Sequence, residues 1–391
     1  MRADAADPLS GDTLMQDVRR YDSMGHHRYG GSGAAQAFDW IAASLGQAGF
    51  VVSSQAFTMD RQYDFEDGSL LIDGRSLTVV PHWWIPESAA RFTLTAPIVA
   101  SGDAPGAFVR ARIPYQGGAY LNAAHHTALE AAFARRPAAV LLTIDHPSAE
   151  IFVYNVDQTH KPWPVPVIVV GAKERQTLEA AETSGRPVTV SIKGSYRRDV
   201  PGRNVIGRLD RGKGRAIVVS TPVTSWFTST CERAPGIAVF LALARRAPEF
   251  GAFDLVFVAT GGHEIGHGGM ERFIRDEAPR PAAVAAWVHL GASLACDNER
   301  MRVINRSESL DALVRRHFSG IKGLDRVGET AAVGELREVY AAGYRSFFGM
   351  AGLHALFHTP FDRATMTGPE ALAPVARAFD GALREIGASG K

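Results

Sequence analysis

The chain has 391 residues, a formal net charge of +1 and a hydrophobic share of 46%, which is ordinary for a globular protein. This length exceeds one ordinary core and favours two domains. The balanced charge argues against nucleic acid or a membrane as partner, because both require a concentrated basic face.

The N-terminal residues lack a basic stretch followed by an apolar one, which argues against a signal peptide. We therefore expect a cytoplasmic protein, although a chain trimmed at its N-terminus would look the same. The two cysteines, Cys231 and Cys296, are too few for a disulfide framework. We expect the core to hold the fold and both cysteines to be small buried side chains.

The first part of the chain is predicted to be helical. Residues 11–49 show apolar positions at helical spacing, with a break near Gly30 and an end at Gly49. A strand is predicted for residues 50–57.

Residues 61–199 have a different character, with many short β-like runs separated by proline and glycine. Helices are predicted at 119–136 and 172–183, and buried strands at 138–144 and 165–170. We interpret this segment as a separate, β-rich inserted domain.

From residue 204 onward, apolar strands alternate with helices. The strands are predicted at 204–209, 215–220, 254–259 and 282–290, and the helices at 236–246, 309–318 and 369–386. This alternation predicts an α/β domain with a mostly parallel sheet covered by helices on both faces. Residues 1–60 and 200–391 are assigned to it, and its site is expected beyond the carboxyl ends of the strands.

Polar residues gather in four segments at these strand ends: Thr221–Trp226, Thr228–Gly236, Gly261–Gly269 and Phe357–Asp362. The third segment contains His263, Glu264 and His267 in an HExxH pattern, which on a helix holds zinc. Its five glycines favour a turn, because each glycine inside a helix costs about 1 kcal/mol relative to alanine.

Several segments resemble the zinc aminopeptidase and glutaminyl cyclase superfamily. FVATGGHEIGHGGMERFI at 257–274 is similar to FVAFDGEELGLLGSRAYV of that family, and FHTPFD at 357–362 to its YHTPAD. NVIGRL at 204–209 resembles its NVIA strand, and PGIAVFLALAR at 235–245 the helix after its DDNGSG turn. Residues 96–175 resemble a protease-associated domain. The resemblance implies the family's α/β fold with an inserted domain of that type.

The family binds two zinc ions through five side chains. The resemblance places those ligands at Pro222, Cys231, Glu264, Gly291 and His358. The family's catalytic glutamate corresponds to His263, and the aspartate that orients its first histidine corresponds to Thr224. Only Glu264 and His358 are retained as metal ligands, whereas a catalytic zinc needs three ligands and a water. We therefore expect at most one zinc ion and no two-zinc site.

Three interpretations of this altered site stay open. The first is a hydrolase acting on an amide or related bond of a peptide or small molecule, whose catalytic candidates are His263, Glu264, Cys231 and His289. It would use either one zinc on Glu264, His358 and Cys231 or His289, or no metal and Cys231 or Ser225 as nucleophile. The second is a non-catalytic pseudopeptidase that serves as a binding module. The third is an ordinary metallo-aminopeptidase with ligands from HExxH.

The stretch before FHTPFD lines the substrate pocket in the family. The resemblance implies Glu335, Arg337, Tyr344 and Arg345 as substrate-binding residues. A forked pair of hydrogen bonds from either arginine would hold a carboxylate. Trp226 is expected to wall a pocket for an apolar or aromatic group. The sequence predicts neither the substrate nor the oligomeric state.

Overall fold

The computed structural model describes residues 7–296, 300–305, 307–329 and 332–389. The chain divides into two compact units. The first contains the residues up to Thr58, Pro201–Phe357 and those from Phe361 onward. The second contains Met59–Val200 together with the short segment His358–Pro360.

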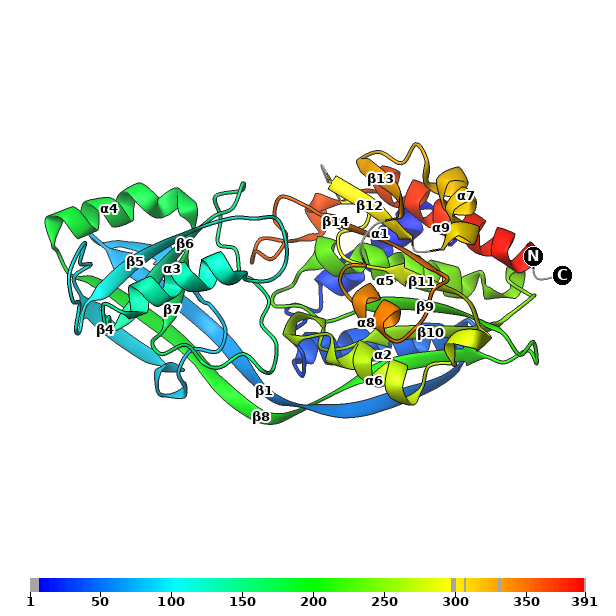
Figure 1. Ribbon diagram of the computed structural model, residues 1–391, viewed down its shortest axis with the longest axis horizontal. Helices are drawn as coiled ribbons and strands as arrows, with labels where there is room; N and C mark the ends of the chain where they lie inside the picture. Colours follow the sequence, from blue (N-terminus) through cyan, green and yellow to red (C-terminus); the bar gives the residue numbers. More distant parts are fainter. Residues whose placement is uncertain (1–6, 297–299, 306, 330–331, 390–391) are drawn as a thin grey trace. The chain divides into compact units, whose positions relative to one another are not determined.

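The first unit is built on a large sheet (Figure 1). Its strands follow the order β13, β12, β14, β11, β9, β10, β8 and β1. Their bounds are β13 Leu324–Glu329, β12 Arg300–Asn305, β14 Phe347–Leu353, β11 Val284–Leu290, β9 Ala216–Pro222, β10 Asp254–Thr260, β8 Val188–Leu209 and β1 Val51–Ile72. The four strands β14, β11, β9 and β10 pair in parallel. Every residue of β9 is buried, as expected for a parallel strand covered on both faces.

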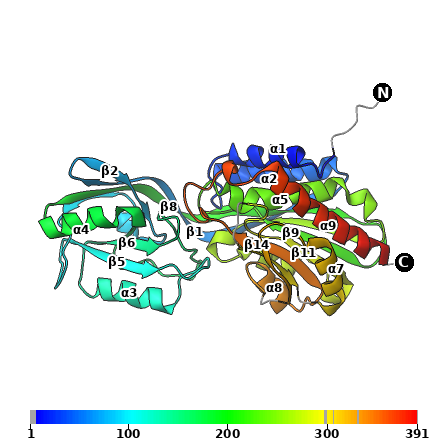
Figure 2. The same ribbon diagram turned by 90° about the horizontal axis from the view of Figure 1, so that it is seen from above.

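Helices cover both faces of this sheet (Figure 2). One face carries α1 Gly11–Asp22, α2 Ser32–Gln47, α5 Thr230–Arg245, α7 Glu308–Phe318 and α9 Pro369–Ser389; the other carries α6 Gly268–Asp276 and α8 Leu336–Ala341. Successive side chains of β9 lie on opposite faces of the sheet. Ile217 and Val219 pack in the core that includes α5, and Val218 packs in the core that includes α6. The predicted α/β fold class is confirmed.

Helix α5 begins at Thr230, earlier than the predicted 236, and contains Pro235. A proline lacks the N–H that would bond to the carbonyl four residues earlier, here that of Cys231. The helix nevertheless extends through this position because Asp362, distant in sequence, caps its N-terminus. The Asp362 carboxylate accepts the N–H groups of Cys231 at 2.7 Å and Glu232 at 3.0 Å.

The second unit contains a four-stranded sheet in the order β3, β7, β6 and β5. The helices and strands that lie wholly within the second unit are β2 Arg75–Thr78, β3 Val80–Pro81, β4 Phe92–Ala96, β5 Phe108–Pro114, α3 Ala123–Phe133, β6 Ala139–Asp145, β7 Val167–Val170 and α4 Arg175–Ser184. Strands β1 and β8 are hydrogen-bonded neighbours, and each has residues in both units. Strand β1 also pairs with β2, and β8 pairs with β4, both antiparallel. The protease-associated identity of this unit stays a prediction.

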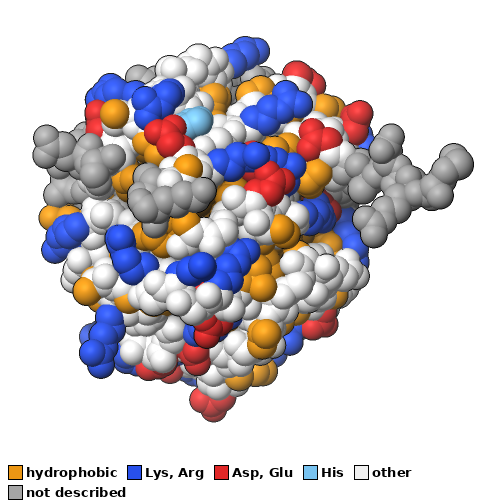
Figure 3. All heavy atoms as spheres, turned by 90° about the vertical axis from the view of Figure 1, so that its right-hand side faces the viewer, with side chains coloured by type: hydrophobic (Ala, Val, Ile, Leu, Met, Phe, Trp, Pro, Cys, Tyr) orange, Lys and Arg blue, Asp and Glu red, His pale blue; other side chains and the backbone are white. Residues whose placement is uncertain are grey.

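No helix among the described residues is long and apolar enough to cross a membrane. On the face drawn in Figure 3, basic and acidic side chains are interspersed.

Candidate functional site

Strands β9, β10 and β11 end in the same region, where the strand ends and neighbouring segments carry a cluster of buried polar side chains. We call this the strand-end cluster. Its members are Ser220, Thr224, Glu232, Arg233, Thr260, His263, Glu264, His289 and Glu335, all at most 9% exposed.

Glu264 is fixed in a glycine turn. Gly262 (φ 75°) and Gly266 (φ 100°) adopt left-handed backbone conformations on either side of the short 3₁₀ turn His263–Ile265. One carboxylate oxygen of Glu264 accepts the Thr224 hydroxyl at 2.6 Å, and the other accepts the Tyr29 N–H at 2.8 Å. Burial raises the pKa of Glu264, whereas these two hydrogen bonds lower it.

Arg233 places a buried positive charge in the cluster. Its guanidinium contacts the Glu232 carboxylate at 2.8 Å, and both side chains are fully buried. The Arg233 Nε donates to the Thr224 carbonyl at 3.0 Å, whereas Nη1 has no hydrogen-bond partner within the described part of the chain. The positive charge of Arg233 contributes to lowering the pKa of both His263 and Glu264.

His263 and Glu335 form a buried imidazole–carboxylate pair. The His263 Nδ1 lies 3.3 Å from Glu335 Oε1, and the Thr260 hydroxyl donates to the same carboxylate at 2.8 Å. Burial first, and then the charge of Arg233, lower the pKa of His263 well below its usual value. Burial raises the pKa of Glu335. His263 is therefore neutral at neutral pH, and Glu335 fixes the orientation of its ring.

His289 lies on β11 at the edge of this cluster. Its Nδ1 faces the Ser220 hydroxyl at 2.9 Å, and the same hydroxyl accepts the Trp287 indole N–H at 2.9 Å. Burial lowers the pKa of His289 to about 4. The negative charge of Glu335 opposes this decrease.

The HExxH segment is a turn followed by a helix, as its glycines predict. His267 has a left-handed backbone (φ 58°), and α6 starts only at the next residue. The rings of His263 and His267 are 4.6 Å apart, but their Nδ1 atoms face different carboxylates, Glu335 at 3.3 Å and Glu338 at 3.1 Å. The helical geometry of a zinc-binding HExxH is therefore absent.

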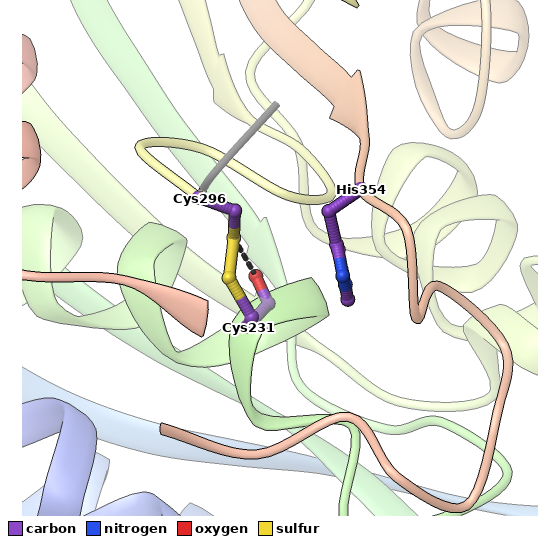
Figure 4. A group of neighbouring side chains, drawn as sticks. All are labelled: Cys231, Cys296 and His354. Atoms are coloured by element: carbon purple, nitrogen blue, oxygen red, sulfur yellow. Dashed lines mark hydrogen bonds between the residues drawn. A yellow bond between two sulfur atoms is a disulfide. The ribbon is translucent and has the colours of Figure 1, made fainter. Parts of the chain in front are cut away.

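Cys231 and Cys296 are buried as expected, but they are joined in a disulfide (Figure 4). The expectation of two separate thiols is wrong in this form of the protein, because their sulfur atoms are brought together by the N-terminus of α5 and the segment after β11. A disulfide sulfur carries no thiolate, so the predicted nucleophile role of Cys231 applies only to the reduced form.

Of the predicted substrate-binding residues, Glu335 contacts a histidine of the strand-end cluster, His263. The Tyr344 hydroxyl donates to the Pro279 carbonyl at 2.6 Å, and the exposed Arg345 stacks over Tyr340 at 4.3 Å. Arg337 is exposed, whereas Trp226 is fully buried. Substrate binding by all five residues stays a prediction.

His358 belongs to the second unit. Its Nδ1 lies 2.9 Å from the Val153 carbonyl oxygen, and its ring stacks on Phe152 with the centroids 5.7 Å apart. A zinc ion shared by Glu264 and His358 stays a prediction.

The residues of the first unit do not fit the two-zinc site that the fold implies. Pro222 and Gly291 offer no side-chain ligand, and the sulfur of Cys231 is bonded to Cys296. Both carboxylate oxygens of Glu264 are engaged in hydrogen bonds. No step of the chemistry proposed below therefore passes through a zinc ion.

The sequence analysis placed Glu232, Arg233 and Asp362 in polar strand-end segments, but it gave neither them nor Thr260 a role. The available signal was the CER sequence at the start of α5, where the family has its acidic turn. Glu232 and Arg233 precede the helix predicted at 236–246 but lie in the first turn of the observed α5. Their burial as an ion pair follows only from this earlier helix start.

No model of a known protein family matches the sequence, and no curated protein matches it. Solved structures do. A zinc aminopeptidase from Bacillus subtilis is 16% identical with a TM-score of 0.74, and the match covers 97% of this chain and 96% of that one. An aminopeptidase from Aneurinibacillus is 17% identical, with a TM-score of 0.64 and coverage of 96% and 93%. A glutaminyl cyclase from Porphyromonas gingivalis is 12% identical, with a TM-score of 0.54 and coverage of 97% and 99%. The chain therefore has the fold of these proteins, as the sequence motifs predict.

Proposed function

We propose that this chain is a hydrolase of an amide or related bond in a peptide or small molecule, with His263 as the general base. The observation that carries this proposal is the His263–Glu335 pair. Its geometry holds Nδ1 against a carboxylate at 3.3 Å and leaves Nε2 to accept a proton. The His263 side chain is 11% exposed, whereas that of Glu335 is fully buried, so the imidazole is the part of the pair that a substrate can reach.

Water is the nucleophile in this proposal, because Cys231 is in a disulfide and the Ser225 hydroxyl donates to Glu232 at 2.8 Å. His263 Nε2 takes a proton from the water as its oxygen bonds to the carbonyl carbon. The imidazolium then returns that proton to the leaving nitrogen as the carbon–nitrogen bond breaks. Water adds across the amide bond, and the histidine is restored.

Arg233 supplies the fixed positive charge for the oxygen that becomes negative in this reaction. Its Nη1 has no hydrogen-bond partner among the described residues, and its Nη2 is held by Glu232. A preorganised donor in a dry site stabilises a developing oxyanion more effectively than it would in water. Glu264 acts through Thr224, whose hydroxyl it binds and whose carbonyl accepts the Arg233 Nε, so we assign Glu264 a positioning role.

The test uses chelator-treated protein and a panel of aminoacyl anilides with free and blocked amino groups. His263→Gln is expected to lower kcat/KM by roughly 10²- to 10⁴-fold, the usual contribution of a general base. Glu335→Gln is expected to lower it less and to move the acid limb of the pH profile. That limb should lie below the ordinary histidine range, because the pKa of His263 is lowered.

The matched control is His317→Gln. His317 and Glu385 form another imidazole–carboxylate pair, 2.9 Å apart and partly exposed. This control should retain full activity, and Glu264→Gln should lose activity while keeping its fold. Equal turnover by His263→Gln and His317→Gln would disprove a general-base role.

A non-catalytic binding module is the second candidate. The observation favouring it is that the carboxylates of Glu264 and Glu232 already bind groups of the protein. Glu264 accepts hydrogen bonds from Thr224 and Tyr29. Glu232 accepts one from Ser225 and pairs with Arg233. It predicts no turnover on any substrate of the panel, together with thermal stabilisation by uncleaved peptides.

A further inference from the structure

A second group of reactive side chains lies in the first unit, at the N-terminus of α5. Cys231 is the second residue of that helix, Cys296 follows β11, and His354 follows β14. One potential ligand atom from each lies within 4.8 Å of the other two, and all three residues are buried (Figure 4). We call these residues the Cys–Cys–His cluster. It shares only Cys231 with the zinc-ligand positions implied by the resemblance.

His354 is held in place but lacks a full set of partners. Its Nδ1 accepts the Leu356 N–H at 3.2 Å. Its Nε2 lies 3.4 Å from Asp362 Oδ2 and makes no hydrogen bond to any described residue. The side chains of His354 and Asp362 are fully buried. A buried imidazole nitrogen beside a carboxylate and two sulfur atoms is chemically suited to a cation.

The surroundings also accommodate two thiols. Because Pro235 has no N–H, the Cys231 carbonyl has no helical donor, and it lies 2.8 Å from Cys296 Sγ. The Cys231 Sγ lies 3.4 Å from the Met366 carbonyl. Each contact becomes an S–H hydrogen bond when the disulfide is reduced, so reduction leaves both sulfur atoms with acceptors already in position.

A cavity borders Cys296 of this cluster. A cavity of about 400 Å³ is lined by Cys296 and by residues of the segment from Thr365 to Pro374, with Met301, Ile321 and Lys322 on its other walls. The disulfide is thus adjacent to a space large enough for a small reductant or a hydrated ion.

We propose that the Cys–Cys–His cluster is a redox-controlled site for a thiophilic divalent cation such as Zn²⁺. A dithiol gives two electrons and two protons to the Cys231–Cys296 bond, which becomes two thiols while the dithiol becomes a disulfide. The cation then displaces both protons and binds the two thiolates and His354, with Asp362 or water as the fourth ligand. An oxidised dithiol, itself a disulfide, then takes two electrons from the two thiolates and two protons from water. It becomes a dithiol, the Cys231–Cys296 bond closes and the cation is released.

The charge balance supports this order of events. Two thiolates beside Asp362 would place three negative charges in a buried region, which is costly without a cation. A divalent ion compensates most of this charge and deprotonates the coordinating thiols. The disulfide form removes two of the three charges and therefore has no comparable affinity.

The experiment compares the oxidised protein with protein reduced until two thiols titrate, using Co²⁺ alone as the probe. Reduced protein is expected to bind about one Co²⁺ per chain and to show thiolate-to-cobalt charge-transfer absorption. Oxidised protein should show neither. His354→Gln and Cys296→Ser should each weaken binding at least about tenfold, as loss of a ligand or its support does. The control His317→Gln should bind like the wild type.

Failure to reduce the disulfide with a dithiol, absence of the charge-transfer band in the reduced protein, or equal binding by His354→Gln and His317→Gln would each overturn the proposal. If the variants do not fold, alkylation of the wild-type chain decides the question. Bound Co²⁺ should slow alkylation of both cysteines at least tenfold, and unchanged alkylation would refute the site. These readouts do not depend on hydrolytic activity, so they are separate from the proposed function.

Discussion

The two units both bury histidines, but they do so differently. In the strand-end cluster, His263 and His289 each face a side-chain oxygen at 3.3 and 2.9 Å. In the second unit, His82 is fully buried against Trp163 and neither ring nitrogen has a hydrogen-bond partner within the described residues. A buried polar group without a partner costs about 1–3 kcal/mol. Hydrogen bonding to a side-chain oxygen therefore distinguishes His263 and His289 from His82.

Three histidines of the second unit pack against the ring of Trp163. The centroids of His160 and His126 lie 4.6 and 6.0 Å from that of Trp163, and that of His82 lies 5.6 Å away. Ring packing fixes these side chains less strictly than a carboxylate fixes a donor, because it is not directional in the same way. The contrast between paired and unpaired buried histidines can be tested by substitution.

Removing the positive charge from the strand-end cluster should have the largest effect. Arg233→Met leaves Glu232 buried and without its counter-charge, which should lower the free energy of unfolding by about 3–5 kcal/mol. Urea denaturation measures this change. The control is Arg91→Met, which breaks the exposed pair with Glu66 and should cost about 0–1 kcal/mol. Similar costs for the two variants would show that pairing in the cluster has no special role.

Acid should unfold the second unit through His82. Burial lowers the pKa of His82 to about 3, whereas the unfolded chain has the ordinary value near 6.5. Between these pH values the unfolded state binds the extra proton, so stability is complete above about pH 6.5 and falls by about 1.4 kcal/mol per pH unit below it. At pH 5 the loss should be about 2 kcal/mol.

Amide hydrogen exchange in β5, β6 and β7 reports this loss for the second unit alone. His82→Leu should reduce the pH dependence and leave stability at neutral pH unchanged or higher. The control His146→Leu removes a buried histidine that faces the Ser148 hydroxyl at 2.8 Å, and it should be destabilising at neutral pH. An unchanged acid response in His82→Leu would exclude His82 as its cause.

A smaller effect is expected when one hydrogen bond in the strand-end cluster is removed. Thr260→Val keeps the shape of the side chain but removes the hydroxyl that donates to both Glu335 oxygens at 2.8 and 2.9 Å. The expected cost is about 1.5 kcal/mol, that of one hydrogen bond to a buried carboxylate. Calorimetry measures the cost, and the pH profile of turnover should shift because Glu335 orients His263. A shift in stability without a shift in the profile would argue against the orienting role.

The sequence predicts the scaffold well because the sheet is encoded locally. The apolar run of β10 and the glycines after it predict a buried strand and a turn without knowledge of the rest of the chain. Glu264 and His358 were identified through motifs of the same local kind. The α/β class and most helices could therefore be predicted.

The pairings inside the site could not be predicted in this way. His263 meets Glu335 across 72 residues, and Asp362 caps α5 from 130 residues away. The Cys231–Cys296 bond likewise joins segments 65 residues apart. Such contacts depend on how strand ends converge in three dimensions, and no periodic pattern along the chain records them.

Strands β1 and β8 connect the inserted residues 59–200 to the first unit. The chain leaves the first unit along β1 and returns along β8, and the two strands are hydrogen-bonded neighbours. Because the chain leaves and returns on adjacent strands, replacement of residues 59–200 requires no new crossover in the main sheet.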